Sequence, residues 1–296
     1  MQNPRLPRSQ AAATDMARAV FTLNLWTLDD TPNARRPWGL PRRLAAAREE
    51  GFDAVHTAAS PGIEALLKKN NLRYMGLVIA RGEVDGAALL TAQHAAGAEI
   101  VNVQLGDGDT DAAAALREAL RLRAAAARCG IRWAIETHRN TATETPERLG
   151  ALAAAYTRRT NEVLPLTIDS SHHALVKHLR PARFGEALLA RPDLIQAARM
   201  IHLRPFNGQH AQVPVMDTNN RLTPEFKAWL DFAAELLRLW LAGPRPGDEL
   251  WIVPEIGPAT PHGYNLSVFP PAWAQARRCH AELRRLWKRL QARHKN

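Results

Sequence analysis

Short apolar runs alternate with longer segments rich in Ala, Leu and Arg from one end of the chain to the other. Each short run has the length and apolar content of a buried strand, and each longer segment has the length of a helix. The alternation predicts repeated βα units around a parallel sheet. Strands are expected at residues 20–26, 52–56, 72–79, 99–105, 131–136, 163–169, 200–203 and 250–256.

Helices are expected between these strands, and Gly51, Gly97 and Gly130 mark the ends of three of them. The expected helices cover residues 42–50, 61–70, 85–96, 111–129, 146–157, 224–241 and 270–296, with further helical segments between 170 and 199. A long loop rich in Pro, Gly and Asn runs from 204 to 222. Loops of this length at such a position are commonly lids or substrate walls.

Eight βα units in 296 residues is the count of a single (β/α)8 TIM barrel. A doubly wound open sheet is the alternative, but it normally carries a glycine-rich phosphate turn after its first strand. Residues 26–30 read WTLDD and contain no glycine. We therefore predict an α/β fold in which one barrel with a parallel eight-stranded core occupies residues 19–296, after a flexible arm over residues 1–18.

The composition, with 46% hydrophobic and 23% charged residues, is typical of a globular protein. No apolar run approaches the ~20 residues of a membrane span, and the N-terminal residues lack the apolar segment of a signal peptide. We expect a cytoplasmic protein with no membrane partner. Cys129 and Cys279 lie far apart and indicate neither a disulfide framework nor a thiolate metal cluster.

The net charge of +10 raises the question of nucleic-acid binding, so its location matters. Residues 270–296 contain eight Lys or Arg and one Glu, and therefore carry +7 of the +10. The same segment contains the apolar residues Trp273, Leu283, Leu286, Trp287 and Leu290. This pattern favours a docked closing helix with a basic outer face, and we do not expect a nucleic-acid partner.

Four consecutive strands carry a side chain of a type that binds metals at or near their carboxyl ends. They are Glu136, Asp169, His202 and Glu255, separated by 33, 33 and 53 residues. In a barrel these strand ends meet at one mouth. Three carboxylates at one point are costly to assemble unless a cation is present. With one imidazole they favour a single divalent ion, Mn, Mg, Co or Zn, with open positions for substrate oxygens.

Each of these residues also has a purely structural explanation. Glu136 has Arg139 nearby as a partner, and Asp169 precedes a helix as an N-cap would. His202 fits a hydrogen-bonded core histidine, and Glu255 fits the partner of an arginine at the mouth. The position of all four at the same end of successive strands favours the shared metal site over four independent structural roles.

Five motifs carry a resemblance to a known superfamily: EEGFDAV (49–55), AIETH (134–138), IDSSHH (168–173), IHL (201–203) and VPEI (253–256). Over residues 20–290 the chain resembles the xylose isomerase-like TIM barrels. That superfamily includes sugar isomerases, ketose 3-epimerases, inosose and dehydroshikimate dehydratases and apurinic-site endonucleases. The motifs indicate the superfamily and its metal set, and do not indicate the substrate.

The resemblance implies that Glu136, Asp169, His202 and Glu255 ligate one divalent metal, and that Glu136 and Glu255 also act as acid and base on opposite faces of a sugar carbon. His172 matches a histidine that contacts substrate oxygens. We therefore expect a sugar isomerase or epimerase that removes a proton beside a carbonyl through a metal-stabilised enediolate. The substrate is expected to be a small sugar or keto-sugar, and a homo-oligomer is expected by analogy.

Further substrate contacts are expected from the long loop and from the ends of other strands. The long loop offers Arg204 and His210, and the other mouth positions offer Asn24, Trp26, His56, Gln104 and His138. A Trp beside polar groups suits the apolar face of a sugar ring, although Trp26 fits the core equally well. The mouth lacks a glycine-rich phosphate grip, which favours a free sugar.

Three other functions stay open. A dehydratase or lyase would form the same enediolate and expel a β-leaving group from a keto-sugar or cyclitol. An endonuclease-like hydrolase would need a three-zinc cluster; His56 and His172 are available for it, but the fourth strand offers Gln104 and the seventh loop contains no Asp-x-His. A barrel that serves only as a binding protein is the last, and the intact metal set argues against it.

Overall fold

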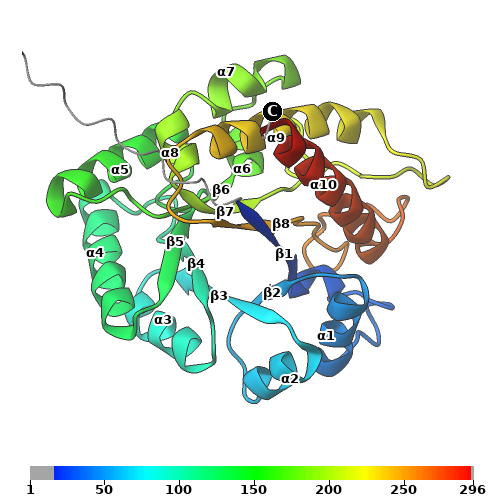
Figure 1. Cartoon of the computed structure of the whole chain (residues 1–296), viewed down its shortest axis with the longest axis horizontal. Coiled ribbons are helices and arrows are strands. Elements are labelled where there is room, and N and C mark those ends of the chain that lie inside the picture. The colour runs from blue at the N-terminus through cyan, green and yellow to red at the C-terminus, as the bar shows by residue number, and fades with distance from the viewer. Residues whose placement is uncertain (1–16, 295–296) are drawn as a thin grey trace, which may run out of the picture.

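Eight parallel strands close into a barrel in which each strand pairs with the next along the chain and β1 pairs with β8 (Figure 1). The strands are β1 (Arg18–Asn24), β2 (Ala54–Thr57), β3 (Arg73–Ala80), β4 (Ile100–Leu105), β5 (Arg132–Glu136), β6 (Leu166–Asp169), β7 (Ala198–His202) and β8 (Glu249–Val253). The single (β/α)8 TIM barrel predicted from the alternation is confirmed.

This computed structural model describes residues 17–294. Most of the predicted N-terminal arm, residues 1–16, lies outside the described residues, and β1 begins at Arg18. The helices that surround the barrel are α1 (Leu40–Glu49), α2 (Ile63–Asn70), α3 (Gly86–Ala95), α4 (Ala112–Cys129), α5 (Pro146–Thr160), α6 (Ser170–Val176), α7 (Phe184–Leu188), α8 (Pro192–Gln196), α9 (Pro224–Ala242) and α10 (Ala272–His294). Two short 3-10 helices, η1 (Leu25–Leu28) and η2 (Pro181–Arg183), complete the set.

Two strands are shorter than predicted because prolines limit them. β6 begins at Leu166, after Pro165, whereas the apolar run begins at residue 163. β8 ends at Val253, before Pro254, so Glu255 lies two residues beyond the strand and not at its end. A proline has no backbone N–H to donate to a neighbouring strand, and strand pairing commonly stops beside it.

The N-terminal end of the barrel is closed by packing and ion pairs. Inward-facing side chains fill the interior: Val20, Ala54, Met75, Ile100, Ala134, Met200, Trp251 and Val253. The guanidinium carbon of Arg73 lies 4.6 Å from the ring centre of Trp251, and its Nη2 lies 2.9 Å from Glu249 Oε2. Because side chains fill the interior at this end and Glu249 is paired with an arginine, the opposite end is the one left for binding and chemistry.

The basic C-terminal segment forms α10 and packs against the barrel, as predicted. Its apolar residues Leu283, Leu286, Trp287 and Leu290 are buried, and Trp273 is partly buried against the same core. Arg277 on its outer side pairs with Glu50 at 2.6 Å.

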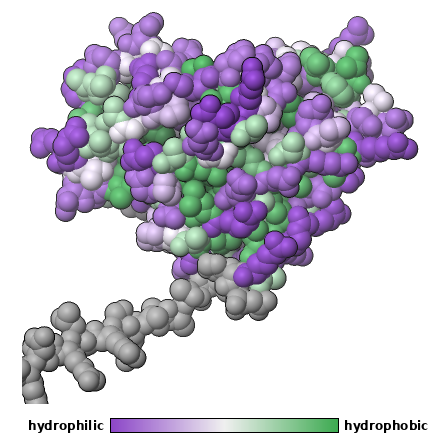
Figure 2. Space-filling model, turned by 90° about the horizontal axis from the view of Figure 1, so that it is seen from above, coloured by the Kyte–Doolittle hydropathy of each residue, from purple (hydrophilic) through white to green (hydrophobic). Residues whose placement is uncertain are grey.

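Hydrophilic side chains cover most of the face seen in Figure 2, with hydrophobic ones between them. Within residues 17–294 no helix is long and apolar enough to cross a membrane.

Candidate metal centre

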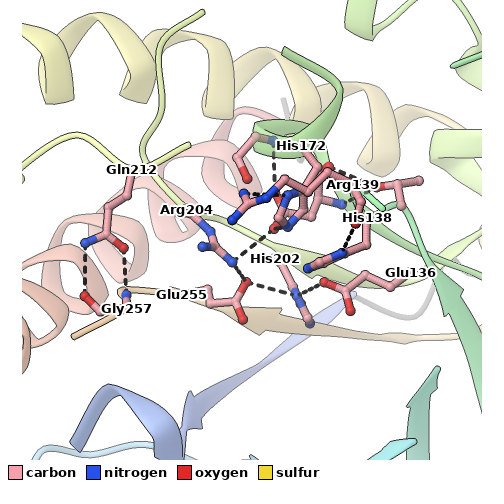
Figure 3. Close-up of polar contacts among 12 residues, drawn as sticks. Glu136, His138, Arg139, His172, His202, Arg204, Gln212, Glu255 and Gly257 are labelled. Carbon is pink, nitrogen blue, oxygen red and sulfur yellow. Dashed lines mark hydrogen bonds and ion pairs between the residues drawn. The ribbon is translucent and has the colours of Figure 1, made fainter. Parts of the chain in front are cut away.

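Glu136, Asp169, His202 and Glu255 converge at the C-terminal end of the barrel. One ligand atom from each of them lies within 4.8 Å of the others. His202 Nδ1 lies between the two glutamates, 3.2 Å from Glu136 Oε1 and 3.3 Å from Glu255 Oε2 (Figure 3). All four side chains are buried, so the arrangement isolates three carboxylates and one imidazole from bulk solvent.

Asp169 has two roles because β6 runs directly into α6. Its Oδ1 accepts a hydrogen bond from the Ser171 amide at 2.9 Å and so caps the helix, as the structural alternative expected. Within residues 17–294 its Oδ2 has no hydrogen-bond partner, and it lies 3.4 Å from His172 Nε2 and 3.5 Å from Arg204 Nη2. The cap fixes the carboxylate in a position that leaves one oxygen facing the cluster.

The two glutamates are held by side-chain amides from other strands. Asn102 and Gln104 on β4 donate to Glu136 Oε2 at 2.8 and 3.1 Å. Asn24 at the end of β1 donates to Glu255 Oε1 at 2.8 Å. Each glutamate therefore has one oxygen fixed by amides, and its other oxygen faces His202. Carboxylates placed in this way have little freedom to turn away from a bound ligand.

Arg204 is a buried cation in contact with the cluster. Its Nη2 donates to Glu255 Oε2 at 2.6 Å, which realises the arginine pairing considered for Glu255. Its guanidinium carbon lies 4.7 Å from the ring centre of Tyr264 and 5.7 Å from that of Trp26. The side chain is buried, and Nε and Nη1 have no hydrogen-bond partner in the described part of the chain.

The charged groups of the cluster, and their burial, shift the pKa values of its members strongly. Burial alone would lower the pKa of His202, but Glu255 and Glu136 raise it to about 10. Burial raises the pKa of Glu136, but His202 outweighs burial and the pKa falls to about 2. Burial raises the pKa of Asp169 to about 6. Burial lowers the pKa of His56 to about 4, so that this neighbour of His202 is neutral.

The donor set fits a divalent cation. Three carboxylates and a histidine are hard and borderline ligands of the kind that Mn, Mg, Co and Zn accept. Asp169 Oδ2 and both ring nitrogens of His202 are buried, and among the residues that the structure describes they lack a partner with hydrogen-bond geometry. Buried polar atoms are normally paired, so these atoms indicate a ligand that they share. A second group of three potential ligands, Glu136, His138 and His172, overlaps the first at Glu136.

A second layer of contacts orients His172. Arg139 Nη1 lies 3.2 Å from His172 Nδ1, and because arginine only donates, Nδ1 is the acceptor and the proton is on Nε2, facing Asp169. Burial lowers the pKa of His172, which keeps the ring neutral. Arg139 Nη2 also donates to the Tyr264 hydroxyl at 2.6 Å. Arg139 thus pairs with His172 and Tyr264 and has no ion pair with Glu136, contrary to the structural alternative for Glu136.

The structure gathers most of the residues predicted to bind substrate around the four. The ring centres of His172 and His138 lie 3.9 Å apart, and those of His56 and His202 lie 5.4 Å apart. Gln104 contacts Glu136, and Arg204 contacts Glu255. Trp26 packs against Tyr264, with their ring centres 5.1 Å apart. His210 does not join this group: it is exposed in the loop after β7 and hydrogen-bonds to Asn207.

Sequence reasoning missed Asn102, Tyr264 and the role of Arg139. Asn102 had a signal, because it lies two residues before Gln104 and alternate strand residues share a face. Tyr264 lies in the loop between β8 and α10, 125 residues from Arg139 in sequence, and no periodicity in the sequence places it at the mouth.

No protein-family model and no curated protein sequence matches the chain. Solved structures of similar fold include an L-ribulose 3-epimerase (TM-score 0.58, 13% identity, 94% of this chain and 97% of that one). They also include a probable 3-DHS dehydratase from Bacillus anthracis (TM-score 0.54, 14% identity, 89% and 98%). A third is a xylose isomerase-like TIM barrel protein from Mycobacterium smegmatis in complex with magnesium (TM-score 0.54, 15% identity, 92% and 96%).

At sequence identities of 13–15%, these matches show likeness of fold alone. The match covers nearly the whole of both chains in each case, and it agrees with the resemblance carried by the five sequence motifs. The chain has the fold of the xylose isomerase-like TIM barrels.

Proposed function

We propose that the protein is a divalent-metal-dependent sugar isomerase or epimerase that moves a proton at a carbon next to a carbonyl. The observation that carries this proposal is the placement of Glu136 and Glu255 on either side of His202, each with one oxygen anchored and one facing the centre. Glu136, Asp169, His202 and Glu255 would hold the cation. The cation would supply Lewis acidity toward adjacent carbonyl and hydroxyl oxygens of a sugar.

The residues of the chain supply the proton transfer. A carboxylate on one side of the reacting carbon removes the proton, and a carboxyl on the other side returns one, which inverts the carbon. Arg204 Nε and Nη1, which have no hydrogen-bond partner among the described residues, and His172 Nε2 offer donors for the oxygens on which negative charge develops. Trp26 and Tyr264 provide an apolar wall for the ring of the sugar.

Two of the solved structures of similar fold, an L-ribulose 3-epimerase and a probable 3-DHS dehydratase, are consistent with this chemistry. A dehydratase differs only after the proton has been removed, when a β-leaving group is expelled. We therefore keep elimination as the second candidate and separate it from isomerisation by the mass of the product.

The proposal predicts hydrogen exchange between a sugar and solvent. The purified protein with Mn²⁺ would be incubated in D₂O with a panel of ketoses and keto-sugars, and the sugars analysed by mass spectrometry and NMR. We expect one deuterium at the carbon beside the carbonyl of the turned-over sugar, with epimer or isomer formed. Loss of water would favour the dehydratase. Absence of exchange on the whole panel, with metal bound, would contradict the proposal.

A further inference from the structure

A cavity of about 810 Å³ opens beside the metal centre, between the loop after β7 and the loop after β8. It falls in the range of roughly 300–1,000 Å³ typical of small-molecule sites. Arg139 and Tyr264 line the side of the cavity that faces the mouth of the barrel. The other lining residues include Asn207, Gln209, His210, Gln212, His262, Asn265, Leu266 and Phe269. Neither the four clustered residues nor His172 lines it.

The cavity and the metal centre share a wall. Arg139 and Tyr264 line the cavity and are joined by a hydrogen bond of 2.6 Å. On the inner side, Arg139 contacts His172 and Tyr264 packs on Arg204, and each of these contacts a carboxylate of the cluster. A molecule whose reacting end is bound at the cluster would reach this cavity past the Arg139–Tyr264 pair, which lies between the two sites.

The walls of the cavity are fixed by bonds between loops. Gln212 joins the two loops: its Oε1 accepts from the Gly257 amide at 2.6 Å and its Nε2 donates to the Gly257 carbonyl at 3.1 Å (Figure 3). Gly208 approaches the loop after α6 so closely that a β-carbon there would overlap the Leu179 carbonyl oxygen. Gln275 on α10 accepts from the amides of residues 215 and 216 at 2.8 Å. The cavity is thus a built feature of the fold.

The chemistry of the lining suits a neutral polyhydroxylated ring. Asn207, Gln209 and Asn265 each use one side-chain amide atom in contacts within the protein. The other atom of each amide, Asn207 Nδ2, Gln209 Oε1 and Asn265 Oδ1, is left for a hydroxyl group, and Phe269 offers a flat apolar surface. A phosphate would require a group of cations, but among the described lining residues Arg139 is the only arginine or lysine, and it is already engaged by His172 and Tyr264.

We propose that this cavity is a second subsite, and that the substrate is a ketose or keto-sugar that carries a second sugar ring, bound there beyond Arg139 and Tyr264. This inference rests on the proposed function, because it assumes that the first ring is bound at the cluster. It assigns the long loop after β7 the role of a substrate wall and places His210 at the second ring, not at the metal.

The test compares ligands with one and two rings. Binding of D-fructose, lactulose and isomaltulose to the Mn²⁺-loaded protein would be measured by calorimetry; in both disaccharides the fructose carries a second hexose. We expect at least one disaccharide to bind about tenfold more tightly than fructose. Leu266→Trp places a large ring in the cavity from a residue that is 58% exposed, and is expected to remove that advantage.

Val268→Trp is the matched control, since Val268 is in the same loop, is 65% exposed and does not line the cavity. It should keep the ratio of disaccharide to fructose affinity. The subsite is overturned if neither disaccharide binds more tightly than fructose, or if Leu266→Trp leaves the ratio unchanged. Deuterium exchange on the same sugars separates the two proposals: tighter binding without exchange supports the subsite alone, and exchange on fructose without an affinity advantage supports the reaction alone.

Discussion

Replacement of Glu136 or Glu255 by glutamine is expected to lower the rate of deuterium exchange at the sugar carbon by about 10²–10⁴-fold, the contribution of a positioned acid or base. Glutamine keeps the shape of the side chain and its contacts with Asn102 or Asn24 but is neither a base nor an anionic ligand. The measurement is exchange by NMR in D₂O, with the metal content of each variant determined in parallel.

Glu249→Gln is the control for these variants. Glu249 begins β8 at the opposite end of the barrel, where it pairs with Arg73. Its replacement should leave exchange within about twofold of the wild type, since no active group changes. If Glu136→Gln and Glu255→Gln both retained the wild-type exchange rate and metal content, the proposed roles of the two glutamates would be wrong.

Replacement of Arg204 by methionine is expected to destabilise the metal-free protein by about 3–5 kcal/mol, because it removes a buried cation from buried carboxylates. Arg204 lies 2.6 Å from Glu255 and 3.5 Å from Asp169. A bound divalent cation would compensate part of this loss. The free energy of unfolding, measured with denaturant, should therefore fall much less in Mn²⁺ than in chelator.

Arg199→Met provides the comparison. Arg199 lies on β7, the strand that precedes Arg204, and its guanidinium donates to the Trp133 carbonyl at 3.4 Å, away from the cluster. Its replacement should cost the same stability with and without metal. An equal loss for Arg204→Met in the two conditions would show that Arg204 and a cation do not share the same carboxylates, and would argue against the metal centre.

The fold was predictable because the buried strands and the helices have different lengths and periods along the chain. The four cluster residues were predictable for a related reason: parallel strands in a barrel bring their C-terminal ends to one mouth, and Glu136, Asp169 and His202 end their strands. Glu255 was also predicted at the end of its strand, but Pro254 ends β8 before it and Glu255 lies two residues beyond.

The contacts made by loops were not predictable from the sequence. Arg139 was considered a partner of Glu136, but the fold carries Tyr264 to it from the loop after β8 and turns it toward His172. His210 was expected near the substrate oxygens, and the path of the loop after β7 places it on the outer cavity. Loop paths depend on tertiary packing, here on Gly208 and Gln212, and have no periodic signal.

The most direct test of the metal centre is elemental analysis of protein purified without chelator, compared with Asp169→Ala and with the surface variant Asp193→Ala. We predict about one Mn, Mg, Co or Zn per chain in the wild type and in Asp193→Ala, and loss of that metal in Asp169→Ala. An unchanged metal content in Asp169→Ala, or no metal in the wild type even after soaking with Mn²⁺, would contradict the assignment of these four residues as a cation site.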